Sequence, residues 1–390
     1  MIEKIIRNEK AINRIYYVVY ALLFFSALVG TTEFMQWPHV TQLRNLTYMG
    51  ATALMLLIWL LTLVLQENLK INVAKTVILG IGLAQFIFGG GSSLILILTI
   101  LIGATDRKSA RVILQESLVI GILVIIVTYL ASINGMIQDN VTTDGRHAFG
   151  FIYYSHFSDK ILYLYMIYRC LRRKRESILG YILAFAMLYL DYRYTHARTV
   201  TICLLIFLLL CIGYDLWKGR LGEKWRPATR FMGILSSGAY IEATLLTFGG
   251  IAIYRILSAM DGLEIPDFLQ TFMARLFFNS RAFEEYGITG LGQSVFEVSN
   301  PTGGENIISD WFFLDNAFMR LFIITGVMTL FFFVAYMTAW MLKTIQKKQF
   351  FLWAALLVAA IDGLSEAYTI NFYYNVFAIL AFASLEDIQG

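Results

Sequence analysis

The sequence predicts an all-α fold, a polytopic membrane bundle of about twelve transmembrane helices. Of its 390 residues, 58% are hydrophobic and only 15% are charged, whereas soluble domains carry about 25% charged residues. Apolar runs near the length needed to cross a bilayer recur along the chain. Basic residues gather in alternate connecting segments, as the positive-inside rule requires. We therefore expect a single transmembrane domain over residues 1–390.

The expected spans follow one another from near the N-terminus to near the C-terminus. They cover 15–30, 46–65, 74–90, 92–105, 116–133, 158–171, 178–192, 199–214, 232–256, 316–342, 350–365 and 369–385. Three of them (92–105, 158–171 and 178–192) are short for a bilayer of about 30 Å. Glycines at 89–91 predict a tight turn between the third and fourth spans.

The distribution of the 31 basic residues predicts that both termini are cytoplasmic. Most Lys and Arg then fall in cytoplasmic segments. Nine basic residues lie elsewhere, and five of these, all arginines, fall in the outer segments 134–157, 191–198 and 257–315: Arg146, Arg193, Arg198, Arg275 and Arg281. Because the rule disfavours them there, their presence indicates a local function.

The longest outer segment, 257–315, lies between the ninth and tenth spans. We expect it to form a large extracytoplasmic loop, and loops of that length in compact proteins are usually functional. Residues 266–276 have helical apolar spacing, which predicts a short helix lying along the outer interface. Glycines at 287, 290, 292, 303 and 304 predict an irregular segment beyond it.

Two outer segments carry the first group of candidate binding residues. Arg146 and His147 precede three further candidates, Tyr153, Tyr154 and His156, while His196 and Arg198 follow the seventh span. Arginine offers a fixed fork of donors that suits phosphate oxygens, and the aromatic side chains suit stacking on sugars. The alternatives are contact with lipid headgroups for the first segment and snorkelling from a helix end for the second.

The second group lies in and after the long loop. It comprises Arg275, Asn279 and Arg281, followed by Asp315 and Asn316. A solvated helix face is the alternative for the first three, and Asp315-Asn316 is also a favoured helix cap. Within or beside the spans, the carboxyl groups of Glu242, Asp362 and Glu366 are either functional or hydrogen-bonded structural acids.

Several motifs are missing from the sequence. It has neither a Walker A loop nor a zinc-binding pattern, and its three cysteines lie in or beside apolar runs, as buried cysteines do. The first outer loop, 31–45, holds Glu33 but no Asp/Glu pair for a metal. We therefore expect no metal, no cofactor and no nucleic-acid partner.

These segments resemble the bacterial Wzy-type polysaccharide polymerases, which are similar in layout to the O-antigen ligase superfamily. The resemblance covers roughly residues 130–345 and rests on short motifs: 146–151 with Tyr153, Tyr154 and His156; 195–199; Arg275, Asn279 and Arg281 with 290–292; and 314–318 with Gly326. The long outer loop is short for the family, a departure that would be consistent with a different sugar substrate. The N-terminal third matches only in hydropathy.

The resemblance implies a glycosyltransferase of the bacterial cell membrane with an extracytoplasmic active site. It would join oligosaccharide repeat units linked to undecaprenyl pyrophosphate into capsular polysaccharide or exopolysaccharide. The expected partners are this lipid-linked oligosaccharide and membrane lipid, with a chain-length regulator and a flippase as further candidates. A glycan ligase and a flippase or transporter of lipid-linked oligosaccharide remain alternatives, and a membrane scaffold is the non-enzymatic one.

We expect transfer to be metal-independent and to invert the anomeric centre, because no carboxylate nucleophile is evident. Arg146, Arg198 and Arg281, with Arg275 as a fourth candidate, would stabilise the departing pyrophosphate. His147 is the first candidate base and His196 the second. Asp315 and Glu285 remain alternatives for that role.

Overall fold

The structure is a computed structural model that describes residues 9–388 except 66–67, 91–92, 143, 173, 218–232, 260–266 and 298–311. The described residues form α-helices, short 3-10 and π turns and three isolated β-bridges, with no β-strand. The predicted all-α fold is therefore confirmed. The chain divides into two compact units, which are described separately. The expectation of one transmembrane domain stays a prediction.

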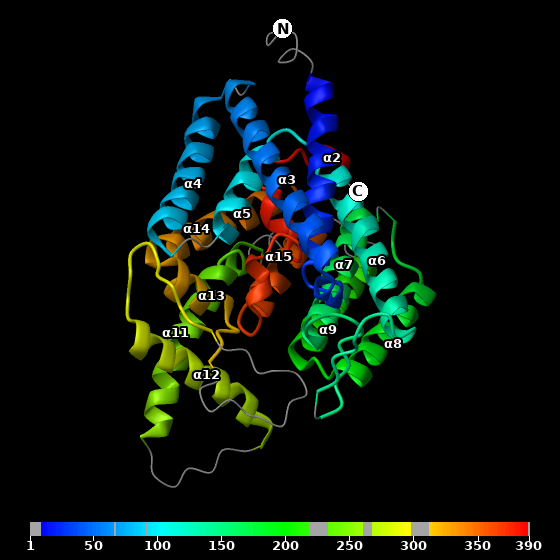
Figure 1. Ribbon diagram of the computed structural model, residues 1–390, viewed down its shortest axis with the longest axis vertical. Coiled ribbons are helices and arrows are strands. Elements are labelled where there is room, and N and C mark those ends of the chain that lie inside the picture. Colours follow the sequence, from blue (N-terminus) through cyan, green and yellow to red (C-terminus); the bar gives the residue numbers. More distant parts are fainter. Residues whose placement is uncertain are drawn as a thin grey trace. The chain divides into compact units, whose positions relative to one another are not determined.

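The first unit contains residues 1–79, 97–222 and 372–390. Its helices lying wholly within these limits are α2 (Glu9–Val29), α3 (Pro38–Leu65), α6 (Ala110–Ile133), α7 (Tyr154–Leu171), α8 (Ile178–Thr195) and α9 (Arg198–Trp217). Helix α2 packs against both α3 and α6, and α7 contacts α6, α8 and α9. The blue-to-green helices in Figure 1 follow this order. The core is aliphatic and aromatic, with Tyr16, Tyr20 and Tyr163 almost fully buried.

The second unit contains residues 80–96 and 223–371. Its helices are α11 (Ala239–Ser258), α12 (Asp267–Tyr286), α13 (Ala317–Arg320), α14 (Val327–Gln346) and α15 (Phe350–Asp362). Helix α11 contacts each of the other four. These helices are the yellow-green to orange-red ribbons of Figure 1. Helices α4 (Leu69–Phe88) and α5 (Ser93–Ala104) cross the limits between the units.

Seven helices within the described ranges are long and apolar enough to cross a membrane. They are Ala11–Val29, Pro38–Leu65, Leu69–Phe88, Ala110–Ile133, Arg198–Leu216, Ala239–Ser258 and Val327–Gln346. Two shorter apolar helices, α5 and α15, accompany them. The chain is therefore a multi-pass helical membrane protein, while the total of twelve spans stays a prediction.

The segment expected as the twelfth span, 369–385, is not an α-helix. Around and within it the structure has the 3-10 helices η4 (Ala367–Ile370) and η5 (Val376–Ile379), joined by turns. Most of these side chains are buried. A continuous apolar run looks the same in sequence whether it crosses a bilayer or fills a protein interior. Irregular backbone is tolerated at such depth only where protein surrounds it.

The expected tenth span, 316–342, is interrupted. Helix α13 passes into a π turn at Leu321–Thr325, and the chain breaks at Gly326 before α14 begins. Gly326 has φ +89°, and a Cβ there would lie 2.4 Å from the backbone nitrogen of Gly292. The first backbone N–H groups of α14 donate to the carbonyls of Thr289 and Gly290. The loop thereby satisfies a helix start that would otherwise be uncapped.

The expected outer loop 257–315 is described only in part, because 260–266 and 298–311 lie outside the described residues. A helix begins at Asp267, close to the predicted start, and continues for 20 residues to Tyr286. It is longer than the predicted 266–276 because its apolar periodicity continues through Phe277, Phe278 and Phe283. Its position along the membrane interface stays a prediction.

Candidate functional site

The loop between α6 and α7 is built on a turn that includes the sequence Phe149-Gly150. Both residues have left-handed backbone conformations, with φ +52° and +82°. A side chain at Gly150 would meet Ile137 Cδ1 at 2.7 Å and the Thr128 carbonyl at 3.0 Å, so only glycine fits. An aromatic residue in this conformation is uncommon, and such strain is concentrated at functional sites.

Three predicted outer segments meet at this loop within the first unit. The Glu33 N–H donates to the Gly150 carbonyl at 2.9 Å, and Thr32 forms an antiparallel bridge with Phe151. The His147 N–H donates to the Tyr194 carbonyl at 2.9 Å. The segments 145–151 and 194–199, which are far apart in sequence, are thereby joined by a backbone hydrogen bond.

His147 forms a side-chain pair with Asp139 that sequence reasoning missed. Its Nδ1 lies 2.7 Å from Asp139 Oδ2. The other carboxylate oxygen accepts the Ala148 and Phe149 N–H groups at 3.1 and 2.7 Å. Asp139 thus stabilises the strained turn and the imidazole together. Because a carboxylate only accepts, this contact places a proton on Nδ1 and leaves Nε2 as the basic nitrogen.

The imidazole is partly open to solvent, since the side chains of His147 and Asp139 are 38% and 27% exposed. The His147 ring stacks on Phe149 at 5.5 Å and meets Tyr194 edge-on at 6.4 Å. Phe149 in turn contacts Tyr129 and Phe157. This aromatic cluster fixes the ring plane of His147 while one edge stays accessible.

Arg146 lies beside this pair and is anchored at one edge. Its Nε donates to Asp144 at 2.7 Å and its Nη1 donates to the Tyr154 hydroxyl at 2.7 Å. Burial alone would raise the pKa of Asp144, but the Thr142 hydroxyl and the Arg146 charge lower it overall. Tyr154, expected to stack on sugar, instead holds the guanidinium, which lies 4.8 Å from its ring centre. The Arg146 side chain remains 28% exposed.

His196 and Arg198 form the turn between α8 and α9. His196 ends α8 in a left-handed conformation (φ +49°) and contacts the Tyr192 ring. Arg198 is exposed at the first position of α9. Neither Arg193 nor Arg198 forms an ion pair with a described residue. A cation is disfavoured at the positive end of a helix, so an anion bound here would relieve the repulsion.

His156 is buried, and Tyr153, which is half-buried, packs against it. His156 Nδ1 lies 3.4 Å from the Thr31 carbonyl, and the ring is edge-on to Tyr153. Its backbone carbonyl accepts from the buried Lys160, whose ammonium also donates to the Tyr374 hydroxyl at 2.8 Å. The contacts of His156 and Lys160 hold the start of α7 against the Thr31 segment and the Tyr374 segment.

The second unit brings three ionisable residues from separate segments together. Arg275 on α12 lies 3.3 Å from a Glu366 oxygen and 3.8 Å from an Asp315 oxygen. Burial raises the pKa of Glu366 to about 8 against the opposing charge of Arg275, and it also raises the pKa of Asp315. Glu366 was foreseen only as an intramembrane acid. We call these three residues the ionic triad.

Two other candidates in the second unit, Asn316 and Asn279, are buried. Asn316 caps α13 by accepting from the Met319 N–H at 2.8 Å, and donates to Thr247 and to the Leu364 carbonyl. The predicted cap is confirmed at Asn316.

Arg281 pairs with Glu285 one turn further along α12. Six residues separate it from Arg275, which places the two on different faces of the helix.

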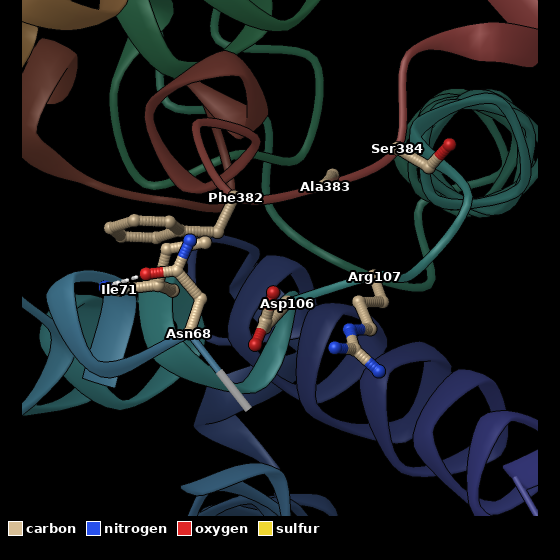
Figure 2. A pocket seen from close by; sticks show the side chains of 7 residues that line it. All are labelled: Asn68, Ile71, Asp106, Arg107, Phe382, Ala383 and Ser384. Atoms are coloured by element: carbon tan, nitrogen blue, oxygen red, sulfur yellow. Dashed lines mark hydrogen bonds between the residues drawn. The ribbon is translucent and has the colours of Figure 1, made fainter. Parts of the chain in front are cut away.

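A pocket of about 600 Å³ opens near the other end of α2 in the first unit. Asn68, Asp106, Arg107 and Phe382 contribute to its lining, and Figure 2 shows the Asn68 and Arg107 side chains on either side of the Asp106 carboxylate. Asp106 forms a buried ion pair with Lys75 at 3.0 Å. Asn68, Asp106 and Arg107 belong to segments that are expected to lie at or near the cytoplasmic side. The pocket therefore does not involve the outer candidates.

Comparisons with family models, curated proteins and solved structures find no match for this chain.

Proposed function

We propose that the chain is a polymerase of the bacterial cytoplasmic membrane. It would join undecaprenyl-pyrophosphate-linked oligosaccharide repeat units, at the outer face, into capsular polysaccharide or exopolysaccharide. The observation that carries the proposal is the half-exposed His147–Asp139 pair, joined by a backbone hydrogen bond to the segment that leads to Arg198. A base beside arginines is the arrangement that glycosyl transfer with a pyrophosphate leaving group requires.

In the proposed reaction, the acceptor hydroxyl gives its proton to His147 Nε2 as its oxygen attacks the anomeric carbon of the donor. The bond from that carbon to the pyrophosphate oxygen breaks, and its electron pair stays on the pyrophosphate. Asp139 stabilises the imidazolium that forms, since its carboxylate already accepts from Nδ1. Direct attack inverts the anomeric centre.

Arginines would stabilise the charge that builds on the departing pyrophosphate. Arg198 is suited to this role because it is exposed and forms no ion pair with the described residues. Arg146 retains donors beyond those that bind Asp144 and Tyr154, because a guanidinium carries five N–H groups. Such preorganised donors act where charge develops and need no metal ion.

The test is polymerisation by the purified protein in lipid nanodiscs, with lipid-linked repeat units extracted from the host cell as substrate and no nucleotide or metal added. Wild-type protein should give a ladder of products, and Arg198→Ala should give none although it folds. Transfer of finished glycan to a different acceptor would instead identify a ligase. Movement of lipid-linked sugar across a vesicle membrane without any ladder would identify a transporter.

A further inference from the structure

The ionic triad of the second unit differs in charge from the arginines of the first unit. Arg275 faces two carboxyl groups within 4 Å, so the triad carries a net charge of −1 with both acids ionised and zero with one protonated. In the first unit, Arg198 and Arg193 have no such partners among the described residues, and only Arg146 is neutralised, by Asp144. A pyrophosphate is therefore attracted by the arginines of the first unit and not by the ionic triad of the second unit.

The ionic triad is nevertheless partly open to a ligand, at Arg275 and Asp315, whereas Glu366 is buried. Arg275, Asp315 and Glu366 keep 26%, 38% and 11% of their side-chain surfaces exposed. The triad offers two acceptor carboxyl groups and a donor fork side by side, which is the mixture that hydroxyl groups on neighbouring sugar carbons can satisfy.

Aromatic surface accompanies these polar groups. Phe278 follows Arg275 by three residues and so lies on the same side of α12. It is half-buried and packs against Phe312, which is itself buried and precedes Asp315 by three residues. The exposed part of the Phe278 ring, beside paired hydrogen-bonding groups, suits a sugar ring, which has polar edges and apolar C–H faces.

We propose that Arg275, Asp315 and Glu366 bind the glycan portion of the substrate through its hydroxyl groups, rather than its pyrophosphate. This inference rests on the proposed function and divides it between two sites: the arginines at 146 and 198 hold the pyrophosphate, and the triad holds sugar. It replaces the expectation, based on sequence, that Arg275 is a pyrophosphate ligand. Glu366 accepts or donates according to its protonation, and either form can bond a hydroxyl.

The two assignments of Arg275 predict opposite responses to Asp315→Asn. If Arg275 held pyrophosphate, removal of the adjacent negative charge would strengthen pyrophosphate binding. If the triad holds sugar, the same substitution leaves pyrophosphate binding unchanged and weakens glycan binding, because a charged acceptor is replaced by a weaker neutral one. The substitution is nearly isosteric, and the triad residue it changes is the most exposed of the three.

The experiment measures two affinities on the full-length protein in nanodiscs. One probe is undecaprenyl pyrophosphate without sugar. The other is the oligosaccharide released by mild acid from the host cell's lipid-linked intermediates. Asp315→Asn and Arg275→Ala should weaken oligosaccharide binding about tenfold, as loss of a charge-assisted hydrogen bond does, and leave undecaprenyl pyrophosphate binding within twofold of wild type. Arg198→Ala should do the reverse.

Tighter binding of undecaprenyl pyrophosphate by Asp315→Asn, or its loss in Arg275→Ala, would overturn this inference and leave the proposed function standing. Failure of the wild-type protein to bind undecaprenyl pyrophosphate would instead remove the proposed function. Thermal unfolding and gel filtration show whether each variant is folded. Glu366→Gln gives an independent second test, since it keeps an oxygen acceptor and should weaken oligosaccharide binding less than Arg275→Ala does.

Discussion

Replacement of Asp139 by asparagine tests whether His147 acts as a base. The asparagine carbonyl oxygen can still accept the two backbone N–H groups that now bind Asp139 Oδ1. Its amide, however, would place an N–H group where Asp139 Oδ2 now lies, 2.7 Å from His147 Nδ1. Nδ1 must then become the acceptor, and the proton moves to Nε2. The imidazole keeps its position, but its basic nitrogen is then Nδ1, which faces the asparagine, and Nε2 can no longer accept a proton.

The size of the effect follows from those contacts. General base catalysis contributes about 10²–10⁴-fold, so Asp139→Asn should lower kcat by that range, or about 3–5 kcal/mol of barrier. Stability should fall by only about 1–3 kcal/mol, since all three hydrogen bonds remain in neutral form, the one to His147 with its direction reversed. The assay is the rate of ladder formation from lipid-linked repeat units at saturating substrate.

Asp144→Asn is the matched control, because it changes a carboxyl group in the same loop that contacts Arg146 and not His147. It should keep kcat within a few-fold and lower KM, since Arg146 gains freedom to bind an anion. The tautomer can be read directly by ¹⁵N NMR, because the chain has only four histidines. A folded Asp139→Asn protein with the wild-type rate would refute the role given to this pair.

Three further outcomes are expected. Arg198→Lys should lose more than about tenfold in polymer yield, because a point charge does not reproduce the guanidinium fork; wild-type yield would contradict a bidentate contact. The free energy of unfolding should fall as pH rises from about 4.5 to about 8, because Glu366 has its pKa raised to about 8 in the folded state. Below that interval both states hold the proton, so no stability is lost, and Glu366→Gln should flatten the slope measured by denaturant titration. Gly150→Ala should lower the free energy of unfolding by about 1–3 kcal/mol, measured by thermal unfolding. Gly145→Ala is the control: its φ is also positive, at +80°, but nothing lies within 4 Å of the added carbon, so it should lower the stability less. Equal losses would show that the contacts at Gly150 are unimportant.

Hydropathy and charge counting anticipated much of this architecture. The apolar runs gave the long helices because a bilayer forces backbone groups to bond within a segment. The same counting placed the residues around 31–45, 134–157 and 191–198 on one side, and these segments do meet in the first unit. Location on the same side of the bilayer permits such a contact, but which loops meet depends on how the helices pack.

The pairings within the loops could not be predicted from sequence. Asp139 reaches His147 because the chain folds back through a bridge between Val141 and His147. Nothing in the sequence fixes that register apart from glycines and polar residues common to many loops. The ionic triad is harder still, because Arg275, Asp315 and Glu366 come from segments that lie 40 and 51 residues apart in sequence. Without tertiary structure, each reads as an isolated surface or membrane charge.

Arg146 and Arg198, which bind ligand in the proposed function, differ in exposure from Arg169, which has a structural role. Arg169 is fully buried and lies 3.0 Å from Asp215 and 3.5 Å from Glu176, both of which are also buried. Desolvation makes such a cluster costly unless its partners compensate for one another, so it has no charge to offer a ligand. Arg198 is exposed, and Arg146 keeps part of its surface open. Of the two, Arg198 has no acidic partner among the described residues, and in the proposed function a pyrophosphate at the membrane surface supplies its counter-ion.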